Sequence, residues 1–162
     1  MGREIRMVPP NWDHPKDERG QLQSMFNSSF AQVAAEWKAN FARWESGERP
    51  DYADEDDRKL EYWEWEGPPP DRDSYRPWND EDATWFQLWE TVSEGTPITP
   101  PFPTKEALAD HLAKHGTYWD NTPWGYAKAA AMVNAGYAPS MILTGGAIIM
   151  GEDVPLAMEQ SK

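Results

Sequence analysis

The sequence predicts an α+β fold in which three or four helices pack against a small antiparallel sheet through proline-rich connections. Residues 28–46 carry apolar side chains at every third or fourth position, which indicates a helix, whereas residues 84–92 alternate as a strand does. Fifteen prolines divide the chain into short elements. With 162 residues and no cysteine, the chain is long enough to bury a core as a single domain over residues 1–162.

The first part of the chain, residues 1–27, is predicted to be an extended arm. Three prolines between positions 9 and 15 exclude a regular helix, and each restricts the preceding residue to extended geometry. We expect Val8 and Trp12 to pin this arm to the body of the domain. His14 lies in a turn-like stretch, so we interpret it as an ordinary turn histidine.

Residues 28–46 predict the first helix. Ser29 followed by Gln32 gives a capping-box pattern, and Gly47 provides a stop. The apolar stripe of this helix consists of Phe30, Val33, Trp37, Phe41 and Trp44. A stripe of aromatic residues at helical spacing is typical of a core, and we prefer that interpretation to a platform that stacks bases.

Residues 45–82 form an acidic segment interspersed with aromatic residues. It holds fifteen Asp and Glu against five Lys and Arg, so it carries −10 of the net charge of −13. Four consecutive acidic residues would fill the first turn of a helix over residues 54–66, where the helix dipole favours negative charge. Leu60 and Trp63 are expected to face inward. Consecutive prolines then predict an irregular connection over residues 67–78.

Residues 84–92 are predicted to be a strand because β-branched and aromatic residues dominate, with Phe86, Leu88 and Val92 on one face. A helix that begins at Asn79, with three acidic residues in its first turn, is the competing interpretation. The sequence SEGT then predicts a turn into an extended PITPPFP stretch.

Two further helices and a hairpin complete the predicted fold. Thr104 caps a helix over residues 105–115, and Thr122 with Pro123 opens another that extends to about Asn134. The sequences SMIL and IIMG predict a hairpin around the glycine pair at positions 145–146. The tail over residues 152–162 is expected to be mobile.

Composition excludes several classes of function. The absence of cysteine rules out disulfides and thiolate metal sites. The sequence has no apolar run that resembles a secretory signal or a membrane span. A net charge of −13 repels nucleic acid and anionic lipid, but it suits a basic protein surface. We therefore expect a cytoplasmic protein that binds neither nucleic acid nor membranes directly.

The candidate sites for catalysis or metal binding have little specificity. His111 and His115 lie four residues apart on a predicted helix, yet the sequence places no third ligand near them. The run DYADEDD lacks the central glycine of a calcium loop. Glu64 and Glu66 form one of many carboxylate pairs in an acidic chain. We predict no catalytic residue, cofactor or metal site, and hence no enzyme.

The acidic segment is the strongest candidate for a functional surface. Carboxylates on a rigid surface can match the spacing of phosphates in a duplex and occupy the groove of a nucleic-acid-binding protein. Interspersed rings would supply binding energy. The residues predicted to bind the partner are Asp51, Asp54, Glu55, Asp56, Asp57, Glu61, Glu64, Trp65, Glu66, Asp71, Asp73, Asp80, Glu81 and Asp82. The alternative is a solvated acidic loop that only keeps the protein soluble.

Three stretches of the chain, VPPNWDHP, WETVSEGTPITPPFPTKEAL and GYAPSM, resemble a group of uncharacterised small acidic proteins encoded by bacteriophages and prophages. The resemblance implies no fold, cofactor or catalytic residue. It implies a phage accessory protein in the host cell cytoplasm that inhibits a basic, nucleic-acid-binding defence component, for example as an anti-CRISPR protein that mimics DNA. The alternative is a virion or accessory protein that binds a small molecule or carbohydrate through exposed aromatic residues.

Overall fold

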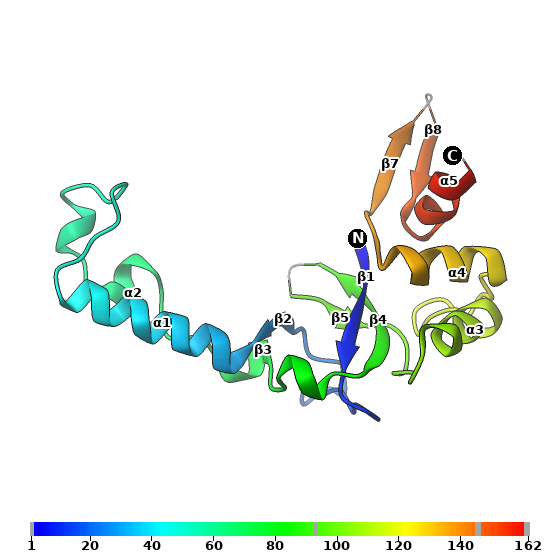
Figure 1. Cartoon of the computed structure of the whole chain (residues 1–162), viewed down its shortest axis with the longest axis horizontal. Helices are drawn as coiled ribbons and strands as arrows, with labels where there is room; N and C mark the ends of the chain where they lie inside the picture. Colours follow the sequence, from blue (N-terminus) through cyan, green and yellow to red (C-terminus); the bar gives the residue numbers. More distant parts are fainter. Residues whose placement is uncertain (1, 93, 145–146, 161–162) are drawn as a thin grey trace. The chain divides into compact units, whose positions relative to one another are not determined.

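A computed structural model describes residues 2–92, 94–144 and 147–160 of the chain (Figure 1). It confirms the predicted α+β fold, since helices and a four-stranded antiparallel sheet both form. The chain divides into two compact units, which we describe separately. The sheet unit comprises residues 1–27 and 78–162, and the acidic unit comprises residues 28–77.

A single domain was predicted from the sequence, whereas the structure has two units. Each unit buries apolar side chains of its own. The two apolar clusters of the sheet unit draw on its own two segments, with Leu88 in one cluster and Trp89 in the other. The acidic unit instead buries Trp44 and Tyr62, which contact each other.

The sheet unit is built on a sheet with the strand order β5-β4-β1-β6. β1 (Gly2–Val8) pairs with β4 (Trp85–Thr91) along its whole length, antiparallel. The short strands β5 (Thr96–Pro97) and β6 (Tyr137–Ala138) pair with β4 and β1, respectively. The predicted strand over residues 84–92 is thus confirmed, and its alternation places the two apolar clusters on opposite faces of the sheet.

The competing helix from Asn79 is reduced to one 3₁₀ turn, Asp80–Asp82. The first part of the extended arm predicted for residues 1–27 is not an arm but forms β1, one of the two inner strands of the sheet. The charged residues of β1 interrupt the alternation of apolar and polar side chains by which a strand is predicted from sequence. Arg6 is buried, yet its guanidinium pairs with Glu4 and lies 4.3 Å from the centre of the Trp89 ring.

Three helices follow β5 in the chain, two of them before β6: α3 (Lys105–His115), α4 (Tyr126–Ala135) and α5 (Val154–Gln160). The predicted cap of α3 is confirmed, because the Thr104 hydroxyl accepts a hydrogen bond from the Ala107 amide at 3.1 Å. Leucines of α3 and Met132 of α4 pack with Leu88 in one core cluster. This cluster anchors both helices to one face of the sheet (Figure 1).

α4 begins later than the predicted start at Thr122 and Pro123. The Thr122 amide donates to the Asp120 carboxylate at 2.9 Å, which holds this stretch in a turn instead of a helix. The turn closes on Gly116, where an added Cβ would lie 2.4 Å from the carbonyl oxygens of Asp120 and Thr122. Gly125, with a φ of 76°, then precedes the first helical residue.

The predicted hairpin forms from β7 (Met141–Thr144) and β8 (Ala147–Met150). Its glycine pair at positions 145–146, like Ser93 in the SEGT turn, lies outside the described residues. The tail expected to be mobile instead forms a 3₁₀ turn, Gly151–Asp153, and helix α5 up to residue 160. Buried Val154 and the ion pair between Arg3 and Glu152 hold it against the unit.

β2 (Phe26–Ser29), of which only the last two residues belong to the acidic unit, leads into α1 (Phe30–Glu45). α1 confirms the predicted helix within two residues at each end. The capping box is wrong, since the Ser29 side chain makes no cap hydrogen bond and Gln32 donates to Glu36. Gly47 follows the helix with a φ of 91°.

The helix predicted over residues 54–66 breaks into a 3₁₀ turn, Asp57–Lys59, and a short α2 (Tyr62–Trp65). Leu60 is extended between them, so the two pieces do not share one helical face. As a result, Leu60 and Trp63, which were predicted to face inward, are exposed, and Tyr62 is buried. A second 3₁₀ turn, Arg72–Ser74, and β3 (Tyr75–Arg76) complete the unit.

Among the described residues, each helix is too short or too polar to cross a bilayer.

Candidate functional site

The residues predicted to bind a partner fall into two groups, one in each unit. Those from Asp51 to Asp73 belong to the acidic unit, whereas Asp80, Glu81 and Asp82 form a 3₁₀ turn of the sheet unit. All of them are exposed apart from Asp57 and Trp65, which are half-buried. The acidic unit therefore presents most of the predicted carboxylates to solvent.

Several of these carboxylates hold the backbone of the acidic unit in turns. The Asp54 carboxylate accepts hydrogen bonds from the amides of Asp56 and Asp57, at 2.9 and 2.8 Å. Asp57 in turn accepts from the Asp54 amide at 3.0 Å, and Asp56 pairs with Lys59. These three acids fold the chain locally, and replacing them would disturb the turn as well as the charge.

Other carboxylates also cap short helices. Glu64 accepts a hydrogen bond from the Glu61 amide at 2.9 Å, and Asp71 accepts from the Asp73 amide at 3.3 Å. Among the described residues, Asp51, Glu55 and Asp73 make no side-chain hydrogen bond or ion pair. Their charges are therefore the ones most readily offered to a partner.

The acidic unit is held together by an aromatic cluster between α1 and α2. Trp37 and Phe41 stack with ring centres 5.5 Å apart, and both contact Tyr62. Two indole groups tie the cluster to the backbone: Trp37 donates to the Gly67 carbonyl at 3.3 Å, and Trp44 donates to the Leu60 carbonyl at 3.0 Å. This cluster fixes the loop that bears the carboxylates.

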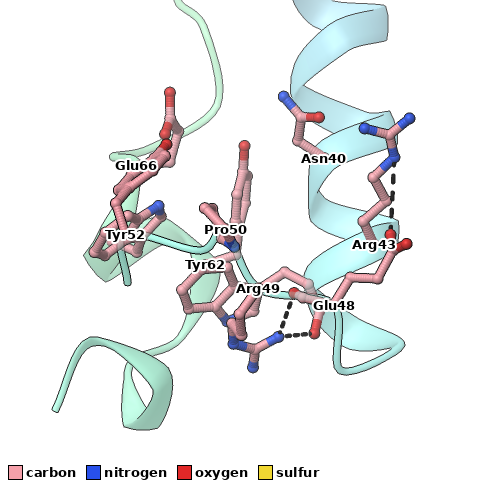
Figure 2. A pocket seen from close by; sticks show the side chains of 10 residues that line it. Asn40, Arg43, Glu48, Arg49, Pro50, Tyr52, Tyr62 and Glu66 are labelled. Carbon is pink, nitrogen blue, oxygen red and sulfur yellow. Dashed lines mark hydrogen bonds and ion pairs between the residues drawn. The ribbon is translucent and has the colours of Figure 1, made fainter. Parts of the chain in front are cut away.

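A pocket of about 360 Å³ opens beside this cluster (Figure 2). In Figure 2, Arg43 and Asn40 extend from α1 on one side, while Tyr52 and Glu66 lie on the other. The remaining lining residues are Trp44, Glu48, Arg49, Pro50, Tyr62 and Trp65.

Arginines and glutamates give the pocket a mixed charge. Arg43 forms an ion pair with Glu48 at 3.9 Å, and Arg49 donates to the carbonyl oxygens of Trp44 and Glu48. Burial raises the pKa of Tyr62, and the Glu66 carboxylate raises it further, so the phenol stays protonated at neutral pH.

The prediction missed one ordered feature of this pocket, a stack of rings that ends at the surface. The Arg49 guanidinium lies over Trp44, Trp44 stacks on Trp65, and Trp65 stacks on Tyr52. Of these, only Trp65 was predicted to bind a partner. The four residues come from α1, α2 and the loop between them, so no regular spacing in the sequence indicates the stack.

The sheet unit contains a second and larger pocket of about 760 Å³. Two of its lining residues, Tyr118 and Trp119, are 52% and 71% exposed. Trp12, His14 and Gln87 line it as well. Its residues come from segments far apart in the chain, so no local sequence pattern indicates this pocket.

His14, predicted to be an ordinary turn histidine, is buried beside that pocket. Trp12 donates its indole N–H to Nδ1 at 3.2 Å, so Nε2 carries the proton and donates to the Gln23 carbonyl at 2.7 Å. Burial lowers the pKa of His14, only partly opposed by the hydrogen bond with Gln23, and Arg6 lowers it further. The ring is therefore neutral at pH 7.

The histidine pair on α3 does not gain a third ligand. The rings of His111 and His115 lie 5.2 Å apart, and His111 also packs on Phe102. Within the described part of the chain, no group of three metal-binding side chains comes together. Comparisons with protein-family models, with curated proteins and with solved structures found no match to this chain.

Proposed function

We propose that the acidic unit binds a basic, nucleic-acid-binding protein of a bacterial host and inhibits it, as a phage-type accessory protein would. One observation carries the proposal: exposed carboxylates between Asp51 and Asp73 lie on a unit whose backbone is held by an aromatic cluster. Because the backbone is already ordered, docking costs less backbone conformational entropy than it would for a disordered acidic segment.

Electrostatics supports this kind of partner. With a net charge of −13, the protein repels nucleic acid but attracts a Lys- and Arg-rich groove, and this attraction accelerates association. Tyr52 and Trp63 are exposed among the carboxylates and supply apolar area that can be desolvated on binding. A surface of this composition competes with a duplex for the same groove, as a DNA mimic in the host cytoplasm does.

The test is capture of host proteins with the intact chain. We expect the captured proteins to be basic, to be released at high salt and to be displaced by added duplex DNA. The variant Asp51→Lys, Glu55→Lys, Asp73→Lys should lose them, because these carboxylates have no structural partner. Capture that is insensitive to salt, to DNA and to this variant contradicts the proposal.

A matched control separates the surface from the overall charge. Glu18, Glu106 and Glu159 are exposed acids of the sheet unit, and Glu106 occupies the first turn of a helix as Asp73 does. Their reversal to Lys changes the net charge equally. We expect this control variant to retain capture.

The second candidate function is binding of a small molecule or carbohydrate by the sheet unit. The pocket of about 760 Å³ with exposed Tyr118 and Trp119 favours it, since such concave aromatic surfaces hold small ligands. Binding of this kind should depend little on salt and should be lost in Trp119→Ala. A panel of neutral oligosaccharides tests it, and no binding by the wild-type chain contradicts it.

A further inference from the structure

A column of stacked groups crosses the pocket of the acidic unit. The Arg49 guanidinium lies 3.8 Å from the centre of the Trp44 ring. Trp44 and Trp65 are 5.5 Å apart with an angle of 25° between their planes, and Trp65 and Tyr52 are 6.0 Å apart at 30°. We call Trp44, Trp65 and Tyr52 the aromatic column. Arg49 covers its inner end.

The two ends of the column differ in exposure. Trp44 is only 4% exposed, whereas Tyr52 is 80% exposed, so the outer face of the phenol ring is open to solvent. Large exposed rings are most useful where they meet a partner. The open end of the column is therefore a place where one more flat group can be added.

Two carboxylates belong to the same region as this open end. Asp51 precedes Tyr52 in the chain, is exposed and makes no ion pair within the described residues. Glu66 lines the same pocket as Tyr52, and Figure 2 shows both on the side opposite Arg43. A group that stacks on Tyr52 will thus lie close to negative charge, which favours a cation and disfavours a nucleotide with its phosphate.

Among cations, a guanidinium fits this end better than an ammonium. Its plane can stack on the ring while its N–H groups, which lie in that plane, donate to carboxylates at the edge. The acidic unit already uses this contact: Arg49 lies over Trp44, and Arg72 lies 5.1 Å from the centre of Phe30.

We infer that an arginine side chain of the partner stacks on the outer face of Tyr52 and donates to the carboxylates of Asp51 and Glu66. The column would then run from Arg49 to the partner's guanidinium, with a cation at each end. This inference rests on the proposed function and specifies its chemistry: the partner presents arginine, in preference to lysine, to the acidic unit.

The experiment compares octa-arginine with octa-lysine as ligands of the full chain at low salt. The peptides carry equal charge, so a difference in affinity reports the side-chain contact. We expect octa-arginine to bind about tenfold more tightly, in line with a desolvated cation–π contact. Tyr52→Leu should remove this preference, and Tyr52→Phe, which keeps the ring, should retain it.

Tyr118→Leu is the matched control, because Tyr118 is also an exposed tyrosine but belongs to the sheet unit. Equal affinity for both peptides, unchanged in Tyr52→Leu, overturns the arginine contact. A second outcome is that the two peptides bind equally while the reversal of Asp51, Glu55 and Asp73 still weakens binding. That result rejects the arginine contact and leaves the proposed function standing. Absence of binding to either peptide contradicts both.

Discussion

Trp44 of α1 and Trp65 of α2 stack with their ring centres 5.5 Å apart, and this contact joins the two helices that flank the acidic loop. The loop between them has little regular structure of its own, apart from one 3₁₀ turn. Its carboxylates therefore depend on the aromatic contact for a defined position. The aromatic residues of the acidic segment, residues 45–82, thus lie among its carboxylates and also hold the acidic surface in place.

Trp44→Ala should unfold the acidic unit selectively. The substitution removes a buried ring and its hydrogen bond to Leu60, which costs about 3–5 kcal/mol. Hydrogen exchange should accelerate in residues 30–45 while the amide of Leu88 in the sheet unit stays protected. Trp119→Ala, at an exposed position, should change the free energy of unfolding by less than about 0.5 kcal/mol. Equal losses in the two variants would contradict this account of the aromatic cluster.

Arg6 is predicted to be indispensable to the sheet unit although it is charged. Arg6→Ala removes the guanidinium that donates to the carbonyl oxygens of Met25 and Glu94, and it leaves Glu4 without its ion pair with Arg6. We expect a loss of about 3–5 kcal/mol in urea unfolding. Arg6→Lys should not restore stability, since an ammonium cannot reach both carbonyls and also stack on Trp89. Full rescue by lysine would show that charge alone matters.

Stability should fall as the pH drops below about 6.5, the ordinary pKa of histidine. Burial lowers the pKa of His14 in the folded chain, so between its folded and unfolded pKa the unfolded chain binds more protons. The contribution of His14 to the free energy of unfolding is complete above about pH 6.5. It is lost as the pH falls towards the lowered pKa of the folded chain, by at most about 1.4 kcal/mol per pH unit.

The control for this pH dependence is His111, whose pKa is also lowered by burial and by His115. Thermal unfolding of His14→Gln and His111→Gln between pH 5 and 7.5 separates the two contributions. We expect the larger flattening of the profile in His14→Gln, because His14 is the more deeply buried ring. An unchanged profile in that variant would contradict the neutral, hydrogen-bonded role of His14.

Gly116→Ala should destabilise the sheet unit through the turn between α3 and α4. The glycine has a φ of 68°, and an added Cβ would meet two carbonyl oxygens at 2.4 Å. We expect a loss of about 2 kcal/mol or more. Gly20→Ala is the matched control, with a φ of 76° but nothing within 4 Å of the added atom. Its cost should be about 1 kcal/mol, and equal effects would mean that the close approach is unimportant.

Elements with a strong local pattern were predictable from sequence. Helix α1 has its aromatic stripe, α3 has its Thr104 cap, and β4 alternates between the two faces of the sheet. β1 was not predictable, because the partners that make Arg6 tolerable in a strand, Met25 and Glu94, are distant in sequence. Local propensity carries no information about such contacts.

The composition of the candidate site was predictable from the sequence, but the positions and roles of its side chains were not. The excess of carboxylates in residues 45–82 is evident in the sequence, but their division between two units and the turn-forming roles of Asp54 and Asp57 are not. The column that ends at Tyr52 depends on the break between two short helices at Leu60, which a continuous helical pattern conceals.

We propose that a particular acidic surface, and not net charge alone, binds a basic partner. Titration of octa-arginine into the two charge-matched variants at low salt tests it most directly. Reversal of Asp51, Glu55 and Asp73 should weaken binding by at least about tenfold, whereas reversal of Glu18, Glu106 and Glu159 should leave the affinity within about twofold of wild type. Equal weakening in both variants would contradict the claim, because it would show that only the overall charge of the chain matters.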